Sequence, residues 1–414
     1  MKKKILYCAA ALTCYNAFGL APSNFLRDFD TNFWPFSPST KRFQWTTVGA
    51  AGFCEQGRNS AGDVVNVAQT WNAQQDALAM LKGFAPGTPQ YELAQILTDD
   101  DDNGTRGHFV VTGKYNMMLS YLNVLRINLP QGFFIDMSVP FYAMRFHHVN
   151  WVDLTQDITL EDRLTKTLLT NNIYQVTETL GDGLNITGWE KSGFGDTAIF
   201  AGWFGRFLQE KDWIKEVLVS VRVGITFPTG VKADQNVIMP LAFGNDGAFG
   251  LPFGAGLDVR FRQWCWVGGH LTFMHIFDHT RDRRIATDPS QTSFLYLQKA
   301  PARCEYGFVQ MANLYVEPRL YHGISLRAAY EHIKQSRNDL YMISNTYSTL
   351  SANTTADLDE WTVHQLIFQL KWDGSWNNPD CGFCPQVSLF TVVPFNGRSS
   401  VQTHMLGVSA NLSF

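Results

Sequence analysis

Apolar and polar residues alternate strictly in the final stretch of the chain, VQTHMLGVSANLSF. Every second residue is apolar, namely Leu406, Val408, Ala410, Leu412 and Phe414, and the residues between them are small or polar apart from one methionine. Side chains of a β-strand point alternately to opposite faces. The stretch therefore predicts a strand with one continuous apolar face.

The same alternation recurs along the chain, for example in EVLVSVRVGITFPTG, GLPFGAGLDVRFRQW and TVHQLIFQLKWDG. Each run has roughly the 9–11 residues that a tilted membrane strand needs, or a little more. About twelve such runs can be marked, and they are 42–55, 108–128, 133–148, 194–208, 216–228, 250–263, 266–279, 305–320, 323–336, 360–372, 386–395 and 401–414.

The connections between these runs alternate in length, since short turns such as PQG at 130–132 follow the even runs and mostly longer segments follow the odd runs. An even strand number with short turns at one end is typical of bacterial outer-membrane barrels. The fold class that we expect is all-β, a transmembrane antiparallel up-and-down barrel of about twelve strands. A soluble sandwich or propeller is the alternative, but its strands usually have only about 5–6 residues.

Residues 42–414 are thus expected to form one barrel domain with two long loops, 56–107 and 149–193. In this topology the long loops face outward and the short turns face the periplasm. Each long loop contains a stretch with helical spacing, the first with Trp71, Leu78 and Leu81 on one face and the second with Leu160, Leu164 and Leu168. The loops could enter the barrel mouth as a partial plug, cap it from outside, or remain surface loops with short helices.

The first segment, MKKKILYCAAALTCYNAFGLAPS, differs from the rest of the chain. A lysine cluster precedes a short apolar stretch and then small residues, which is the pattern of a secretory signal peptide. We expect residues 1–19 to be cleaved and 20–41 to form a periplasmic segment. An anchor helix is the alternative, but the apolar stretch is shorter than the roughly 20 residues that span a bilayer. The expected location is the outer membrane of a Gram-negative bacterium.

Composition narrows the possible partners. The chain has 414 residues, of which 45% are hydrophobic and only 17% charged, below the ~25% charged residues of an average soluble domain. The net charge of −4 includes the positive charges of three lysines in the signal segment, so the net charge becomes more negative when this segment is cleaved. No basic patch suggests nucleic acid as a partner. Outer-membrane lipid and a small solute are the partners that the barrel prediction implies.

Two motifs resemble a known family. GFGDTAIFAGWFGRF begins at Gly193, ITFPTG ends at Gly230, and the glycine-rich GAFGLPFGAGLDVRF follows. A Gly-x-Gly-Asp start and a strand ending in Pro-Thr-Gly resemble the outer-membrane barrels linked to meta-cleavage aromatic degradation, which are similar to fatty-acid-transporter-like porins. The resemblance implies passive passage of small solutes, apolar ones among them. The terminal strand with Leu412 and Phe414 resembles the signal that the barrel-assembly machinery recognises.

Charged residues occupy the faces opposite the apolar ones, where a polar lumen tolerates them and lipid would not. Opposite charges could pair across a narrow lumen and close it, or rows of arginine could line a pore and favour anions. The candidate pore-lining residues are Lys114, Asp136, Asp196, Arg222, Asp258, Arg260, Arg262, Glu317, Arg319, Arg327, Glu331 and Lys371.

One acidic stretch, TDDDDNGTRG, has the spacing of a calcium loop in its first half. Asp99, Asp101 and Asn103 alternate and Gly104 follows, but Val110 stands where the twelfth-position acid belongs. A weak calcium site and a solvated acidic loop both remain open. No other cofactor is expected.

Two cysteines form a C-x-x-C pair, Cys381 and Cys384, in an expected periplasmic turn. An oxidising compartment makes a local disulfide plausible, while zinc would need further ligands that are not nearby. The pairing of the five cysteines beyond the signal segment stays open.

The leading functional hypothesis is a passive channel or transporter, with a sealed structural or adhesive barrel as the alternative. A hydrolase is a weaker hypothesis. Histidines lie near expected strand ends, but no nucleophile elbow or paired catalytic motif accompanies them, so we expect no enzyme activity. These histidines include His147, His148, His275, His279 and His404.

Overall fold

Twelve antiparallel strands form one closed barrel in the computed structural model, which describes residues 41–97, 104–262, 264–374 and 384–414. The barrel prediction is therefore confirmed, and each predicted run overlaps one barrel strand. The strands are β1 (Phe43–Cys54), β5 (His108–Asn128), β6 (Phe133–Asp153), β8 (Thr197–Leu208), β9 (Ile214–Phe227), β10 (Gly250–Phe261), β11 (Cys265–Ile276), β14 (Val309–Tyr321), β15 (Ile324–Gln335), β17 (Trp361–Asp373), β18 (Cys384–Arg398) and β20 (His404–Ser413).

The first and last barrel strands close the wall. β1 pairs with β20 along its length, from Gln44 opposite Ser413 to Phe53 opposite His404. Phe43 and Phe414 exchange both backbone hydrogen bonds, at 3.1 and 3.0 Å, and their rings stack 6.0 Å apart. Because β1 also pairs with β5, every barrel strand has two neighbours, and the wall leaves no unpaired edge.

The predicted apolar faces point outward. On β20, Leu406 and Val408 are 54% and 52% exposed, whereas Ser409 between the outward positions is 1% exposed and faces the interior. The same holds on β10, where Leu251, Phe253 and Leu257 are exposed. The alternation of apolar and polar residues along each strand is thus the alternation between the outside of the wall and the lumen.

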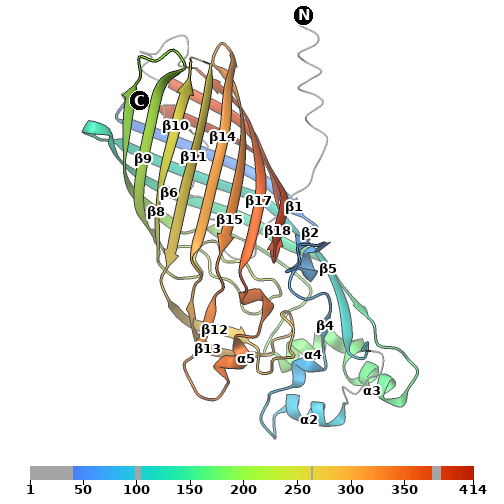
Figure 1. Ribbon diagram of the computed structural model, residues 1–414. Helices are drawn as coiled ribbons and strands as arrows, with labels where there is room; N and C mark the ends of the chain where they lie inside the picture. Colours follow the sequence, from blue (N-terminus) through green and yellow to red (C-terminus); the bar gives the residue numbers. More distant parts are fainter. Residues whose placement is uncertain (1–40, 98–103, 263, 375–383) are drawn as a thin grey trace, which may run out of the picture.

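The two ends of the barrel differ. Short turns such as 129–132 and 322–323 close one end, called here the short-turn end, and the long connections gather at the other, the long-loop end (Figure 1). No helix in the described part of the chain is long and apolar enough to cross a membrane. The elements of the long connections are β2 (Gln56–Arg58), β3 (Val64–Asn66), β4 (Gln75–Asp76), α2 (Pro89–Ile96), α3 (Leu160–Leu168), α4 (Ile173–Leu180), β7 (Trp189–Phe194), β12 (His279–Ile285), β13 (Gln298–Glu305), β16 (Asp339–Met342), α5 (Thr349–Ala352) and β19 (Ser400–Val401), with short 3-10 turns Val67–Gln69, Ala79–Leu81, Thr170–Asn172 and Ala356–Leu358.

The second long loop forms the expected helix, but its apolar stripe is not its buried side. Leu160 is 67% exposed, whereas Asp162 and Thr165 of α3 are buried. Asp162 is held by a capping box with Thr159 and by Arg106, whose Nε lies 2.8 Å from the carboxylate. A polar contact therefore orients this helix.

In the first long loop, the stretch whose spacing predicted helical turns forms only 3-10 turns. Leu78 and Leu81 of this stretch are nevertheless buried. Its α-helix is α2, further along the loop, where the sequence shows no helical spacing of apolar residues that predicts it. Thr88 caps α2 by accepting a hydrogen bond from the Tyr91 N–H, and Pro89 occupies the first turn.

Several sequence predictions lie outside the described residues. These are the signal peptide 1–19, most of the segment 20–41, the calcium candidates Asp99, Asp101 and Asn103, and Cys381 of the C-x-x-C pair. Among the described cysteines, Cys54, Cys265 and Cys304 are buried free thiols.

The outward position of Leu406 gives a direct test of the wall. Leu406→Arg places a charge against hydrocarbon and should destabilise the refolded barrel by about 2–4 kcal/mol if the site lies near the bilayer midplane. Equilibrium unfolding in lipid vesicles measures this loss. Leu406→Met, which adds no charge, is the matched control and should remain close to the wild type. Equal stability of the two variants would contradict a lipid-facing position.

Candidate functional site in the barrel interior

A buried ion cluster lies inside the wall formed by β14, β15 and β17. Glu317 is its centre, with the Arg327 Nε at 2.9 Å and the Lys371 Nζ at 3.0 Å. The Ser325 hydroxyl donates to the same carboxylate at 2.9 Å. Removing one partner from such a group leaves a buried charge uncompensated, which typically costs about 3–5 kcal/mol.

A second acidic group, Asp258 of β10, is 1% exposed. Tyr315 donates its hydroxyl hydrogen to Asp258 at 2.6 Å, and the His270 Nε2 lies 3.1 Å away. The Arg327 guanidinium lies over the Tyr315 ring, 3.8 Å from its centre, which links this group to the Glu317 cluster. Gly268 makes the room, because a Cβ there would lie 2.1 Å from the Asp258 Oδ1.

Further ion pairs lie in the part of the barrel interior that is nearer the short-turn end. Arg126 and Asp136 face each other across the first short turn and form two hydrogen bonds of 2.6 Å. Glu216 on β9 pairs with Arg206 at 2.5 Å and with Arg260 at 3.3 Å. Charges of opposite sign therefore meet across neighbouring strands, as a narrow lumen requires.

The sequence placed most of the charged interior correctly on the inward faces. Asp136, Asp258, Glu317, Arg327, Glu331 and Lys371 are buried inside the wall, and Arg222, Arg260 and Arg319 share the inward face but are less buried. Whether these residues line a pore remains a prediction.

Three candidates lie elsewhere. Lys114 is on the opposite face of β5 from the buried Tyr115 and pairs with Glu55. Arg262 is exposed in a short turn, 4.2 Å from the Trp213 ring centre. Asp196 lies in a loop junction described below. For Lys114, a register shift at Met117/Leu119 reverses the inward and outward faces partway along β5, which strict alternation could not reveal.

Sequence reasoning also missed inward residues, among them Arg126, Arg206, Glu216, His270 and Tyr315. For Arg126 a usable signal exists, because a tight turn at 130–132 places residue 126 opposite residue 136 in an antiparallel hairpin.

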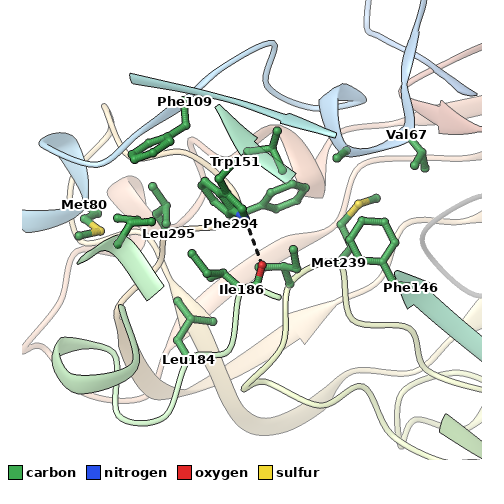
Figure 2. Packing of buried hydrophobic residues seen from close by; sticks show 14 of the residues in the cluster. Val67, Met80, Phe109, Phe146, Trp151, Leu184, Ile186, Met239, Phe294 and Leu295 are labelled. Atoms are coloured by element: carbon green, nitrogen blue, oxygen red, sulfur yellow. Dashed lines mark hydrogen bonds between the residues drawn. The ribbon is translucent and has the colours of Figure 1, made fainter. Parts of the chain in front are cut away.

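The long-loop end of the lumen is filled by an apolar cluster, which we call the mouth cluster. The inward residues Tyr115, Tyr142, Met144 and Phe146 of the wall are at most 1% exposed. Side chains from four long connections pack against them (Figure 2). The loop members include Val67, Met80, Leu184, Ile186, Met239, Phe243, Phe294 and Leu295.

Hydrogen bonds from the wall and from the neighbouring strand β7 hold the loop backbone in this cluster. The Tyr115 hydroxyl donates to the Met239 carbonyl at 2.6 Å, and the Trp189 indole donates to the Ile238 carbonyl at 2.9 Å. The Trp151 indole donates to the Ile186 carbonyl at 3.1 Å, as Figure 2 shows. The loop between β9 and β10 therefore enters the mouth rather than covering it from outside.

The glycine motifs noted in the sequence form the junction that anchors this loop. The Asp196 carboxylate accepts hydrogen bonds from the backbone N–H of Gly230, at 2.9 Å, and of Asn245. Thr229 accepts from the Thr197 N–H at 2.9 Å and donates to the Gly195 carbonyl at 3.1 Å. A Cβ on Gly230 would lie 2.3 Å from the Phe243 carbonyl oxygen, so only glycine fits.

Comparison with solved structures gives the fold class an independent basis. An outer-membrane channel of Pseudomonas putida F1 matches with a TM-score of 0.51 over 92% of this chain and 99% of that one, at 12% identity. This likeness shows that the two chains share the fold of a closed antiparallel outer-membrane barrel. The toluene transporter TbuX of Ralstonia pickettii aligns over 90% of this chain and 89% of its own, with a TM-score of 0.32 at 9% identity. No protein-family model and no curated protein matches the chain.

The Asp196 junction yields a prediction for this barrel. Asp196→Asn keeps the shape of the side chain but turns one of its acceptor atoms into a donor that faces a backbone N–H. Leaving a buried donor unsatisfied costs about 1–3 kcal/mol, so amides of 229–245 should exchange hydrogen faster. Mass spectrometry of hydrogen exchange measures this change.

Asp212→Asn, in a short turn at the other end of the barrel, is the control and should leave exchange in 229–245 unaltered. Wild-type exchange rates in Asp196→Asn would show that the junction does not hold the loop.

Proposed function

We propose that the protein is a passive channel for small solutes, in which the loop between β9 and β10, residues 228–249 and called here the mouth loop, controls passage through the mouth. The observation that carries the proposal is the composition of the lumen. Paired charges fill the part nearer the short-turn end, and the mouth cluster fills the other. Replacing buried ion pairs with apolar residues is often neutral or stabilising, so stability alone does not explain why the lumen is charged. A route for water and solute through the lumen does explain it.

The wall and the mouth loop contribute differently to this function. Wall strands are held by ladders of backbone hydrogen bonds on both sides. The mouth loop is held chiefly by side-chain contacts and by single hydrogen bonds such as that from Tyr115 to Met239. Elements with few backbone pairings open at lower free energy than a sheet, so the loop is the part that we expect to move.

A sealed structural barrel is the second candidate, because many interior side chains are fully buried, Asp136 and Glu317 among them. Planar-bilayer recording of the refolded protein separates the two functions. Discrete conductance steps support the channel, and a folded but silent barrel supports the structural role.

Tyr115→Phe should raise the fraction of time that the channel conducts. The change removes the hydroxyl that binds the Met239 carbonyl and leaves the ring in place. Loss of one hydrogen bond costs the closed arrangement about 1 kcal/mol, which corresponds to roughly a fivefold larger open population. Single-channel recording measures the open probability. Tyr121→Phe, on the outward face of β5, is the control and should behave as the wild type; an unchanged Tyr115→Phe channel would contradict control by this loop.

The lumen should prefer anions, because basic side chains outnumber acidic ones on its inward face. The basic set is Arg126, Arg206, Arg222, Arg260, Arg319, Arg327 and Lys371, and the acidic set is Asp136, Glu216, Asp258, Glu317, Glu331 and Asp373.

Glu331→Gln should increase this anion preference. Glu331 accepts hydrogen bonds from the amides of Asn313 and Gln365, so the variant removes a lumen charge while keeping a hydrogen-bonding group. The reversal potential in a KCl gradient should shift toward that of chloride. Glu178→Gln, on an exposed loop helix, serves as the control; a shift toward potassium in Glu331→Gln would refute a lumen-charge origin of selectivity.

A further inference from the structure

Two histidines face each other on the outside of the barrel wall. His332 of β15 and His364 of β17 are direct partners in the antiparallel pairing of these strands, and their ring centres lie 4.7 Å apart. Both side chains are half-buried and point outward, since the residues beside them, Glu331 and Gln365 among them, are buried inside the wall. The two imidazoles therefore form a pair that keeps accessible surface.

The pair lies at the long-loop end of the apolar outer surface. Along β15 and β17 this surface begins with the exposed Ile324 and Trp372, continues to Tyr330, and is followed by the histidines. From residue 324 to residue 332 the strand rises roughly 27 Å, which is about 20 Å along the axis of a tilted barrel. The apolar band of such barrels is about 25 Å tall. The pair is therefore close to the edge of the band, where an ion from the surrounding water reaches it.

A tyrosine hydroxyl orients one of the two rings. The Tyr330 hydroxyl lies 2.7 Å from the Nδ1 of His364. A histidine that binds a metal through one nitrogen almost always donates the N–H of the other nitrogen to a neighbouring oxygen, which fixes the tautomer and the ring. In this tautomer Nδ1–H of His364 donates to the Tyr330 oxygen, and Nε2 offers its lone pair. His364 thus has the outer partner that a metal ligand requires.

The charges around the pair are compatible with a bound cation. Lys334, the next outward residue of β15, pairs with Glu360 at 2.7 Å, so its positive charge is balanced. Within the described part of the chain, no group of three or more metal-binding side chains occurs. The two imidazoles are therefore the protein ligands on offer here, and water would occupy the other coordination positions of an ion.

We propose that His332 and His364 together bind one divalent transition-metal ion of the copper, nickel and zinc class. Neutral imidazole suits these ions, whereas calcium and magnesium prefer oxygen ligands. Two nitrogens that bind one ion at about 2.0–2.1 Å lie roughly 3–4 Å apart, a separation that rings with centres 4.7 Å apart can present. The site lies outside the lumen, so the inference holds for an open channel and for a sealed barrel alike.

Copper titration of the refolded barrel in detergent micelles tests the site. The protein carries no histidine tag, and every sample contains Cys381→Ser and Cys384→Ser, so that these thiols do not compete for the ion. We expect calorimetry to show saturable binding of one Cu²⁺ per barrel that excess Mg²⁺ does not prevent. Electron paramagnetic resonance should show coupling of the bound copper to two nitrogen nuclei. Absence of saturable binding, or bound copper without nitrogen coupling, would overturn the proposal.

Three variants locate the ion. Loss of an outer hydrogen-bond partner costs about 10–100-fold in metal affinity, so Tyr330→Phe should weaken Cu²⁺ binding at least about tenfold. His332→Asn and His364→Asn each remove a ligand and should weaken it further. Wild-type affinity in either asparagine variant would refute the site, and wild-type affinity in Tyr330→Phe would refute the role of its hydroxyl. Circular dichroism verifies that each variant is folded.

His147→Asn is the matched control. His147 and His148 form another close pair of rings, with centres 4.2 Å apart, but they are neighbours in sequence rather than partners on two strands. Arg145 lies on the same outward face of β6 as His147, and its positive charge opposes a bound cation. Cu²⁺ binding in His147→Asn should equal that of the wild type. A loss of binding in this variant would place the ion at the other pair and overturn the proposal.

Thermal unfolding gives a second readout that does not depend on the binding signal. Residues 332 and 364 meet only in the folded sheet, so an ion that bridges them stabilises the folded state. The unfolding midpoint should rise with Cu²⁺ concentration in the wild type and remain constant in His364→Asn. An equal rise in both proteins would show that the stabilising ion binds elsewhere and would refute the site.

Discussion

Closure of twelve strands into one barrel is the constraint on which the rest of the molecule depends. Once β1 pairs with β20, every second side chain of the wall must face a lumen that is too narrow to hydrate all of them. A charge in that space needs a partner, because an isolated buried ion is very costly. The contacts of Glu317 with Arg327 and Lys371, and of Asp258 with Tyr315, follow from this requirement.

The same constraint explains why the glycine motifs are where they are. Asp196 precedes β8 and Gly230 follows β9, and these strands are neighbours in the wall, so the Asp196 carboxylate can reach the Gly230 N–H. Glycine is needed because the loop folds back so closely that Phe243 leaves no room for a side chain. The motif that suggested a family resemblance therefore anchors the mouth loop through hydrogen bonds. Asp196 positions this loop and does not have the pore-lining role that its charge suggested.

The sequence was sufficient for the wall and insufficient for the mouth, for a physical reason. Side chains of a strand such as β20 alternate between the two faces. Leu406 could therefore be assigned to the outside and Ser409 to the inside without knowledge of the neighbouring strands. The partner of Tyr115 is the Met239 carbonyl, 124 positions away in a loop without periodicity. The helix α3 shows the limit of periodicity itself, since Arg106 and a capping box orient it with Leu160 exposed. Arg126 lies between these cases, because turn geometry could have identified it opposite Asp136.

The arrangement of interior surfaces also bears on which solute could pass. The mouth cluster offers apolar side chains over most of its surface, and the lumen beyond it offers paired charges. A hydrated ion loses its water in the mouth cluster, which is costly. A pure hydrocarbon crosses that cluster easily but gains nothing among the charges of the lumen. For the proposed channel, a small molecule with an apolar body and one polar group meets a favourable environment in both layers, so the order of surfaces along the barrel favours such a solute over a bare ion or a hydrocarbon.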